Sequence, residues 1–158
     1  MKRIVSLIAL AGLLVVNRTS AQSPWIIKAD KIDPNNYYGI TAANGMIGIV
    51  SSPEPFKVKN VVLAGAYDLY GRGRVSNFLN SFNLLNMYLE VDGKRIDAKM
   101  VSNFKQELDM QHAAFTTTFD YGDKASIKYT YYSLRQLPFT VLMDVAVTAK
   151  KAINVTAA

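Results

Sequence analysis

An alternation of apolar and polar residues with a period of two runs through the chain from Ile47 onward, and Gly, Asn, Asp and Pro interrupt it at short intervals. Successive side chains of an extended strand point to opposite faces, so this alternation is typical of half-buried β-strands. No window after residue 21 keeps a helical spacing of apolar residues for three turns. The pattern therefore predicts an all-β fold.

A β-hairpin is predicted around Asp92-Gly93, which separates the run Leu84 to Val91 from the run Lys94 to Asp97. Asp-Gly supplies the positive φ angles that a two-residue type I′ turn requires. The segment 51–59 carries Pro53 and Pro55, and we expect it to be a loop between strands.

Three longer strands are predicted over 113–121, 124–134 and 139–149. In the second, one face carries apolar side chains that we expect to be buried: Ala125, Ile127, Tyr129 and Tyr131. The other face should be wetted: Lys124, Ser126, Lys128 and Thr130. We expect the third strand to be central, with a partly apolar outer face. Because a single sheet of this length would leave an apolar face in water, we predict two packed antiparallel sheets, a large β-sandwich.

The first 21 residues have the composition of a secretory signal peptide. Lys2 and Arg3 precede an apolar run of 13 residues over 4–16, and small residues lead to Ala21. This run is short for a bilayer span, which needs about 20 residues, so we expect no stable membrane insertion. We predict cleavage after Ala21 and export to the periplasm or the exterior, an entry segment over 22–36, and a sandwich domain over 37–158.

Removing the signal peptide changes the charge of the chain. The full sequence has a net charge of +6, and residues 1–21 contain three basic residues and no acidic one, which leaves 15 − 12 = +3. Such a weak balance without a basic stripe does not favour a nucleic-acid partner. With no Cys and a single histidine, His112, the sequence offers no thiolate or multi-histidine metal site, and we expect no metal and no cofactor.

Two acidic residues of one predicted strand, Glu107 and Asp109, are candidates for a catalytic pair, because glycoside hydrolysis uses two carboxyl groups across the scissile bond. A solvated strand face or a turn cap explains them as well. A lone His112 is more often a surface or packing residue than a catalytic one. We therefore assign no catalytic residue.

A glycine-rich connection over 64–77 combines aromatic and planar polar residues. Aromatic faces stack on sugar rings, and planar polar groups hydrogen-bond hydroxyls, so this stretch is a candidate wall of a carbohydrate site. The candidate substrate-binding residues are Tyr67, Asp68, Tyr70, Arg72 and Asn77. The same composition also fits an ordinary surface loop.

The order of four segments resembles the N-terminal domain of glycoside hydrolase family 65. These segments, spread over roughly 37–149, are Asn44-Gly45-Met46-Ile47-Gly48, Leu63-Ala64-Gly65-Ala66-Tyr67, Leu84 to Gly93, and Glu107-Leu108-Asp109-Met110. The resemblance implies a large β-sandwich that precedes an (α/α)₆ barrel, and it places the catalytic glutamate in that barrel.

The resemblance implies that these residues are part of a longer enzyme, inactive alone, whose partners are an oligosaccharide or α-glucoside and the C-terminal barrel. The last residues, 153–158, resemble a further strand, which we interpret as a sign of an unfinished sandwich. We favour an exported inverting α-glucoside hydrolase as the parent. A disaccharide phosphorylase of the maltose, trehalose or kojibiose type, a free-standing carbohydrate-binding module and a protein-interaction domain stay open as alternatives.

Overall fold

The computed structural model describes residues 23–68, 77–78, 83 and 85–157, so the predicted signal peptide lies outside the described residues. The strands are β1 (Ile26–Ala29), β2 (Thr41–Ala43), β3 (Ile47–Ser51), β4 (Val58–Leu63), β5 (Tyr67–Asp68), β6 (Asn77–Phe78), β7 (Leu89–Val91), β8 (Lys94–Arg95), β9 (Val101–Asp109), β10 (Ala114–Tyr121), β11 (Ala125–Ser133), β12 (Val141–Ala149) and β13 (Val155–Ala157). Two short 3-10 helices are η1 (Pro34–Asn36) and η2 (Ala98–Met100). The all-β prediction is confirmed.

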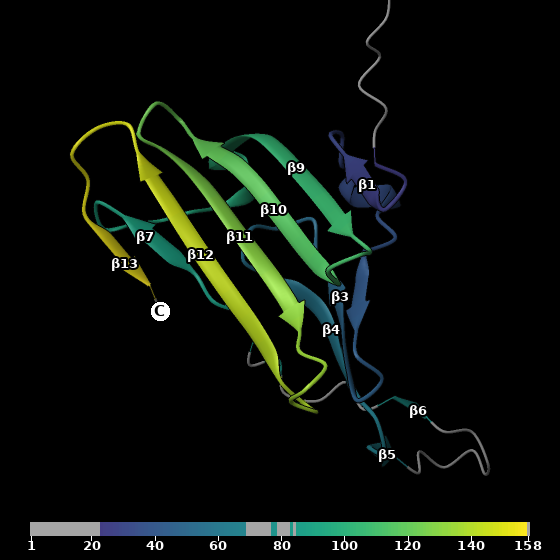
Figure 1. Ribbon diagram of the computed structural model, residues 1–158. Helices are drawn as coiled ribbons and strands as arrows, with labels where there is room; N and C mark the ends of the chain where they lie inside the picture. The colour runs from purple at the N-terminus through teal and green to yellow at the C-terminus, as the bar shows by residue number, and fades with distance from the viewer. Residues whose placement is uncertain (1–22, 69–76, 79–82, 84, 158) are drawn as a thin grey trace, which may run out of the picture.

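The first layer is a five-stranded antiparallel sheet in the order β1-β9-β10-β11-β12. The three long predicted strands correspond to β10, β11 and β12 (Figure 1). The predicted central position of β12 is wrong. Within the described part of the chain β12 pairs only with β11, and its inward face, which includes Val145, is half-buried. Its apolar alternation therefore reflects packing on one face and not a neighbour on each side.

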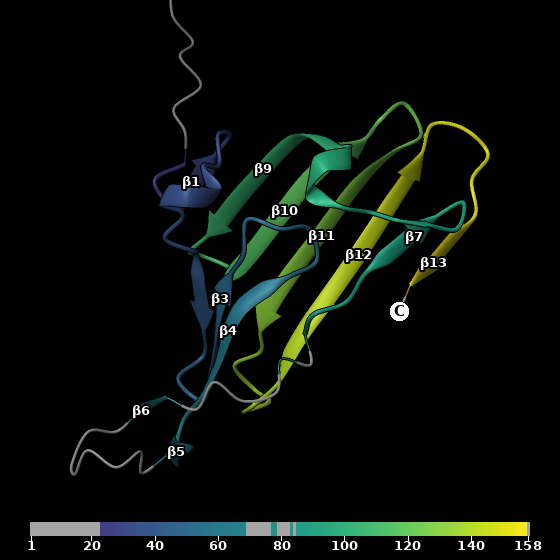
Figure 2. The same cartoon turned by 180° about the vertical axis from the view of Figure 1, so that it is seen from behind.

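The second layer consists of two three-stranded sheets, β2-β3-β4 and β13-β7-β8. Figure 2 shows β3, β4 and β7 lying across the five-stranded sheet. Strands β5 and β6 form a separate two-stranded ribbon that extends away from both layers (Figures 1 and 2). The chain is thus a two-layered β-sandwich, as the sequence predicted, with a projecting ribbon.

Aromatic side chains fill the space between the layers. Phe56 of the second layer lies flat against Tyr129 of β11 at 4.8 Å between ring centroids, and meets Phe119 of β10 edge-on at 5.8 Å. Tyr129 and Tyr131 are both almost fully buried, as the alternation in β11 predicted. Thr130, expected to face water, is only 3 % exposed. It lies in an interior strand, and its hydroxyl is 3.0 Å from that of Thr116 on β10.

The predicted hairpin is present. Asp92 and Gly93 have φ angles of 52° and 72°, as a type I′ turn requires, and they join β7 to β8. β7 begins only at Leu89, later than expected. Residues 85–88, which precede it, are not part of a strand. One of them, Asn86, accepts a hydrogen bond through its side chain from the backbone N–H of Val58, the first residue of β4, at 2.8 Å.

A buried polar cluster ties the N-terminal segment to the five-stranded sheet. The Tyr37 hydroxyl donates to the Gln106 side-chain oxygen at 2.7 Å, and the Gln106 amide donates to the Ser52 carbonyl at 3.0 Å. The Ser51 hydroxyl lies 2.5 Å from that of Tyr37 and accepts from the Ile40 N–H. Gln106 is only 1 % exposed, so these bonds replace water that it cannot reach.

Candidate functional site

The β5–β6 ribbon carries three of the five residues predicted to bind substrate. Asp68 on β5 lies directly opposite Asn77 on β6, and Tyr67 lies opposite Phe78. The other two candidates, Tyr70 and Arg72, lie outside the described residues. The structure therefore brings Asp68 and Asn77 to one register position, with Tyr67 beside them, on a ribbon that extends from the body of the domain (Figure 1).

A tight turn connects β4 to the first strand of this ribbon. β4 ends at Leu63, and the Ala66 N–H donates to the Leu63 carbonyl at 3.3 Å across Gly65, whose φ is 80°. A side chain at this φ would strain the backbone, which explains the glycine of the Ala-Gly-x-Tyr segment. The Ala64 N–H also donates to the Met46 carbonyl at 2.8 Å. The end of β4 is thus attached to the β2–β3 turn before the ribbon begins.

Asn44 gives the Asn-Gly-x-x-Gly segment a structural role. Its side-chain oxygen accepts from the backbone N–H groups of Met46 and Ile47, both at 2.9 Å, which closes the β2–β3 turn. Its side-chain amide donates to the Leu134 carbonyl at 2.7 Å, beyond the end of β11. This asparagine therefore joins the two layers of the sandwich.

The two carboxylates considered as a catalytic pair have separate basic partners. Glu107 pairs with Lys28 of β1 at 3.1 Å. Asp109 accepts from the backbone N–H of Gln111 and lies 2.7 Å from the His112 ring, and this hydrogen bond with His112 is the main reason that its pKa is lowered. His112 itself is largely exposed. The geometry matches the alternative explanation, a strand-face ion pair and a turn cap.

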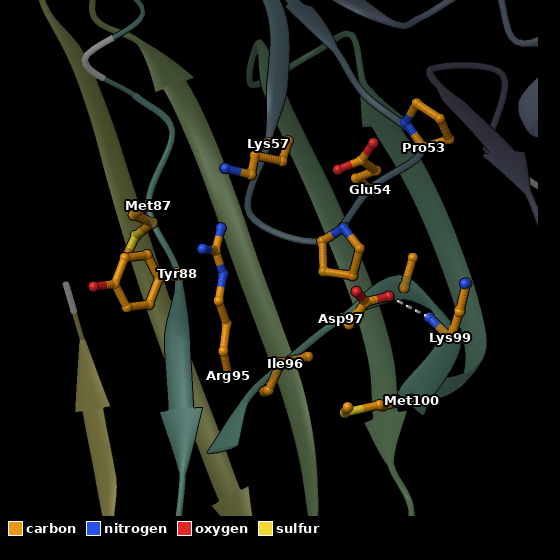
Figure 3. Close-up of a pocket in the computed structure, with 12 residues that line it drawn as sticks. Pro53, Glu54, Lys57, Met87, Tyr88, Arg95, Ile96, Asp97, Lys99 and Met100 are labelled. Carbon is orange, nitrogen blue, oxygen red and sulfur yellow. Dashed lines mark hydrogen bonds between the residues drawn. The ribbon is translucent and has the colours of Figure 1, made fainter. Parts of the chain in front are cut away.

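A pocket that sequence reasoning missed opens beside the second layer of the sandwich. It has a volume of ≈ 600 Å³ and lies between the loop 53–57, the β7–β8 hairpin and η2 (Figure 3). The Arg95 guanidinium carbon lies 4.4 Å from the centroid of the Tyr88 ring, a cation–π contact. Arg95 is opposite Glu90 in the register, so Tyr88 is its diagonal neighbour. The predicted hairpin alone could have identified this pair.

The loop 53–57, which lines this pocket, is anchored to the core through Phe56. The Lys57 N–H donates to the Glu54 carbonyl at 3.3 Å, with Pro55 and Phe56 between them. Phe56 has a φ of 58° and its own N–H donates to the buried Tyr129 hydroxyl at 3.1 Å. Pro followed by a residue with positive φ is the pattern of a type II turn. The turn therefore presents Glu54 and Lys57 at the surface while it anchors Phe56 inside.

Within 23–68, 77–78, 83 and 85–157, no three His, Cys, Asp or Glu side chains are grouped so that they could hold a metal ion. Across the same described ranges, no helix has the length and apolar character needed to cross a bilayer.

Fold and geometry together define an all-β sandwich domain in which the Glu107 carboxylate forms an ion pair and the Asp109 carboxylate caps a turn. The chain belongs to glycosyl hydrolase family 65: the model of that family's N-terminal domain matches residues 38–149. The predicted family resemblance is confirmed.

Two relatives are both named kojibiose hydrolase. The protein of Mucilaginibacter mallensis is 76 % identical over 157 residues, which cover 99 % of this chain and 23 % of the relative. The protein of Flavobacterium johnsoniae is 54 % identical over 135 residues, 85 % of this chain and 20 % of the relative. The chain thus spans about a fifth to a quarter of the length of these curated relatives.

A solved structure has a similar fold. The putative kojibiose phosphorylase from human microbiome superposes with a TM-score of 0.53 at 19 % identity, over 69 % of this chain and 17 % of that one. At this identity the similarity concerns the fold alone.

Proposed function

We propose that this chain is the non-catalytic N-terminal domain of an exported hydrolase that acts on kojibiose or closely related α-glucosides. The observation that carries the proposal is the 76 % identity, over nearly the whole chain, to a protein named kojibiose hydrolase. The second relative, at 54 % identity, has the same name. We further propose that the reaction groups belong to the part of the protein that corresponds to the remaining length of these relatives.

A hydrolase parent is favoured over a phosphorylase. Both sequence relatives are named hydrolases, whereas the phosphorylase structure is similar at 19 % identity and supports only the fold. Export supports the same choice, because phosphorolysis outside the cell would leave a charged sugar phosphate on the wrong side of the membrane. The proposed export rests on the sequence of residues 1–21, and sequencing the N-terminus of the mature protein tests it. Gln22 is the expected first residue.

The kinetics of the longer protein distinguish the two parents. A hydrolase releases glucose from kojibiose at a rate independent of inorganic phosphate, and glucose 1-phosphate does not accumulate. A phosphorylase requires phosphate and forms one sugar phosphate for each disaccharide cleaved. Strict phosphate dependence would overturn the proposed hydrolytic activity while leaving the family assignment intact.

Within the domain, we assign sugar contact to the β5–β6 ribbon. The ribbon projects from the sandwich, and its sequence combines tyrosines with Asp68 and Asn77 at one register position (Figure 2). Such groups stack on sugar rings and bond to hydroxyls. The Tyr67→Ala variant should weaken sugar binding by about 1–3 kcal/mol, measured by calorimetric titration of the longer protein with kojibiose.

Tyr38→Ala is the matched control for this titration, because Tyr38 is 90 % exposed on the N-terminal segment and lies away from the ribbon in sequence. Equal affinity of the Tyr67 and Tyr38 variants would remove the ribbon from the sugar site. Sugar binding by the 158-residue chain itself would instead favour a self-sufficient carbohydrate-binding module.

A further inference from the structure

We propose that the pocket between loop 53–57, the β7–β8 hairpin and η2 binds a sugar that carries one anionic group, a carboxylate or a phosphate. This site is separate from the β5–β6 ribbon, and the inference does not depend on the activity of the longer protein. It rests on the placement of Arg95 and Lys57, on the apolar residues that line the pocket and on its size.

Arg95 is held in an orientation suited to an anion. Its guanidinium carbon lies 4.4 Å from the centroid of the Tyr88 ring, so one face of the guanidinium is covered by an aromatic side chain. A guanidinium presents its N–H donors in a fixed planar fork that matches the oxygens of carboxylate or phosphate. Because the ring limits its rotation, less conformational freedom is lost when an anion binds.

Lys57 adds a second positive charge to the same pocket. Figure 3 shows the ends of Lys57 and Arg95 directed toward the space between Tyr88 and Glu54. Among the residues that the structure describes, neither cation has a carboxylate oxygen within 4.0 Å. Two cations without a carboxylate partner in a shared hollow favour an anionic ligand.

The rest of the pocket fits the neutral part of a sugar. Apolar side chains are distributed around the pocket: Ile96 is buried, Met100 is 49 % exposed, and Met87 and Pro53 line other parts of it (Figure 3). The C–H face of a sugar ring can pack against such side chains. The Glu54 carboxylate faces the pocket and can accept hydrogen bonds from hydroxyls (Figure 3).

A bare anion would leave both of these features unused. The volume of ≈ 600 Å³ lies within the usual range for small-molecule pockets.

The other charged residues of the pocket have defined roles or positions. The Asp97 side chain accepts from the backbone N–H of Lys99 at 2.9 Å and so caps η2. This carboxylate is therefore engaged at the end of the pocket away from Tyr88 (Figure 3). Lys99 lines the same end, beside Asp97 and away from Arg95 and Lys57 (Figure 3). We therefore assign the anionic group of the ligand to Arg95 and Lys57.

Titration of the 158-residue chain with four small molecules tests the site. Glucuronate and glucose 6-phosphate supply the two acidic groups, glucose supplies the ring alone, and inorganic phosphate supplies the anion alone. We expect at least one acidic sugar to bind about tenfold more tightly than glucose and than inorganic phosphate. Which acidic sugar binds more tightly identifies the acidic group.

Substitutions locate the binding. Arg95→Gln should weaken binding of the acidic sugar about tenfold, and Arg95→Lys should weaken it less, because it keeps the charge and loses the fork. Arg135→Gln is the matched control, since it removes the same charge from an exposed arginine outside the pocket. Lys57→Gln provides a second test if the Arg95 variant unfolds, which thermal melting would reveal.

Three results would each overturn the inference. One is equal affinity for glucose and for both acidic sugars. Another is an equal effect of the Arg95→Gln and Arg135→Gln substitutions on binding. The last is that neither acidic sugar binds to the folded 158-residue chain at concentrations up to about 10 mM.

Discussion

Phe56 occupies a turn position at which glycine is usual, and its buried ring explains why. The residue has a φ of 58° and is 1 % exposed, with its ring packed against Phe119 and Tyr129. A bulky side chain in the left-handed region costs about 1–2 kcal/mol. The burial of an aromatic ring stabilises the fold by more than this cost, so the strained turn persists.

This balance predicts an order of stabilities for substitutions at Phe56. Phe56→Ala should lower the free energy of unfolding by about 3–5 kcal/mol, because it removes the ring and keeps the backbone strain. Phe56→Gly should cost about 1 kcal/mol less than Phe56→Ala, because glycine relieves the strain. Urea unfolding of the purified domain gives both values.

Phe139 is the matched control for these two variants, because it also has a positive φ, 60°, but is 49 % exposed. Phe139→Ala should change stability by roughly 0.5 kcal/mol or less. If Phe56→Gly proved less stable than Phe56→Ala, backbone strain at Phe56 would be refuted.

Burial also makes the core sensitive to alkaline pH. It raises the pKa of Tyr129 to about 12 and raises that of Tyr131 as well, whereas tyrosines of the unfolded chain titrate near 10. Between these values the unfolded chain loses protons that the folded chain keeps. The free energy of unfolding should therefore fall by about 1.4 kcal/mol per pH unit for each of these tyrosines above about pH 10.

Tyr129→Phe should reduce the fall in the free energy of unfolding by the contribution of one tyrosine, because phenylalanine does not ionise. Urea unfolding curves from about pH 9 to about pH 11 measure the slope for both proteins. An unchanged slope in the variant would show that Tyr129 does not titrate in this way.

Among the strands, those with a strict alternation were predictable and those with short or irregular pairing were not. The runs over 113–121, 124–134 and 139–149 gave β10, β11 and β12 nearly at their observed bounds, because one face of each packs on the core. The edge position of β12 was missed, since alternation reports which face is buried and not how many neighbours a strand has. β1 is too short to show a pattern, whereas β13 lies within the segment 153–158 that was expected to be a further strand.

The hydrogen bonds that attach the N-terminal segment to β9 could not be predicted from the sequence either. A buried glutamine in an alternating strand looks like a solvent-facing residue, and only the fold brings Tyr37 and Ser52 to Gln106. In contrast, the Arg95–Tyr88 contact could have been inferred from the hairpin register, although the loop that completes the pocket could not.

Removing this polar connection should destabilise the domain. Gln106→Ala leaves the Ser52 carbonyl without its side-chain donor and leaves the Tyr37 hydroxyl with Ser51 alone, at a cost of about 1–3 kcal/mol. Lys105→Ala, at the exposed neighbouring position on the opposite face of β9, should cost about 0.5 kcal/mol or less. Comparable losses in the two variants, measured by thermal or urea unfolding, would contradict a structural role for the glutamine.

For the molecule as a whole, the family could be predicted from the order of four short segments, each of which now has a local structural explanation. Asn44 closes a turn and joins the layers, Gly65 adopts a positive φ before the ribbon, and Asp92-Gly93 forms the hairpin turn. Asp109 caps the turn after β9. These contacts account for local structure, so the four segments predict the fold, and the location of the catalytic groups is part of the proposed function.

The most direct test of the proposed function compares glucose release from kojibiose by the 158-residue chain with that by the longer protein of the length of its relatives. We predict that the longer protein cleaves kojibiose, and that the purified 158-residue chain, folded by circular dichroism, does not. Cleavage of kojibiose by the 158-residue chain alone would contradict the proposal that this domain is non-catalytic.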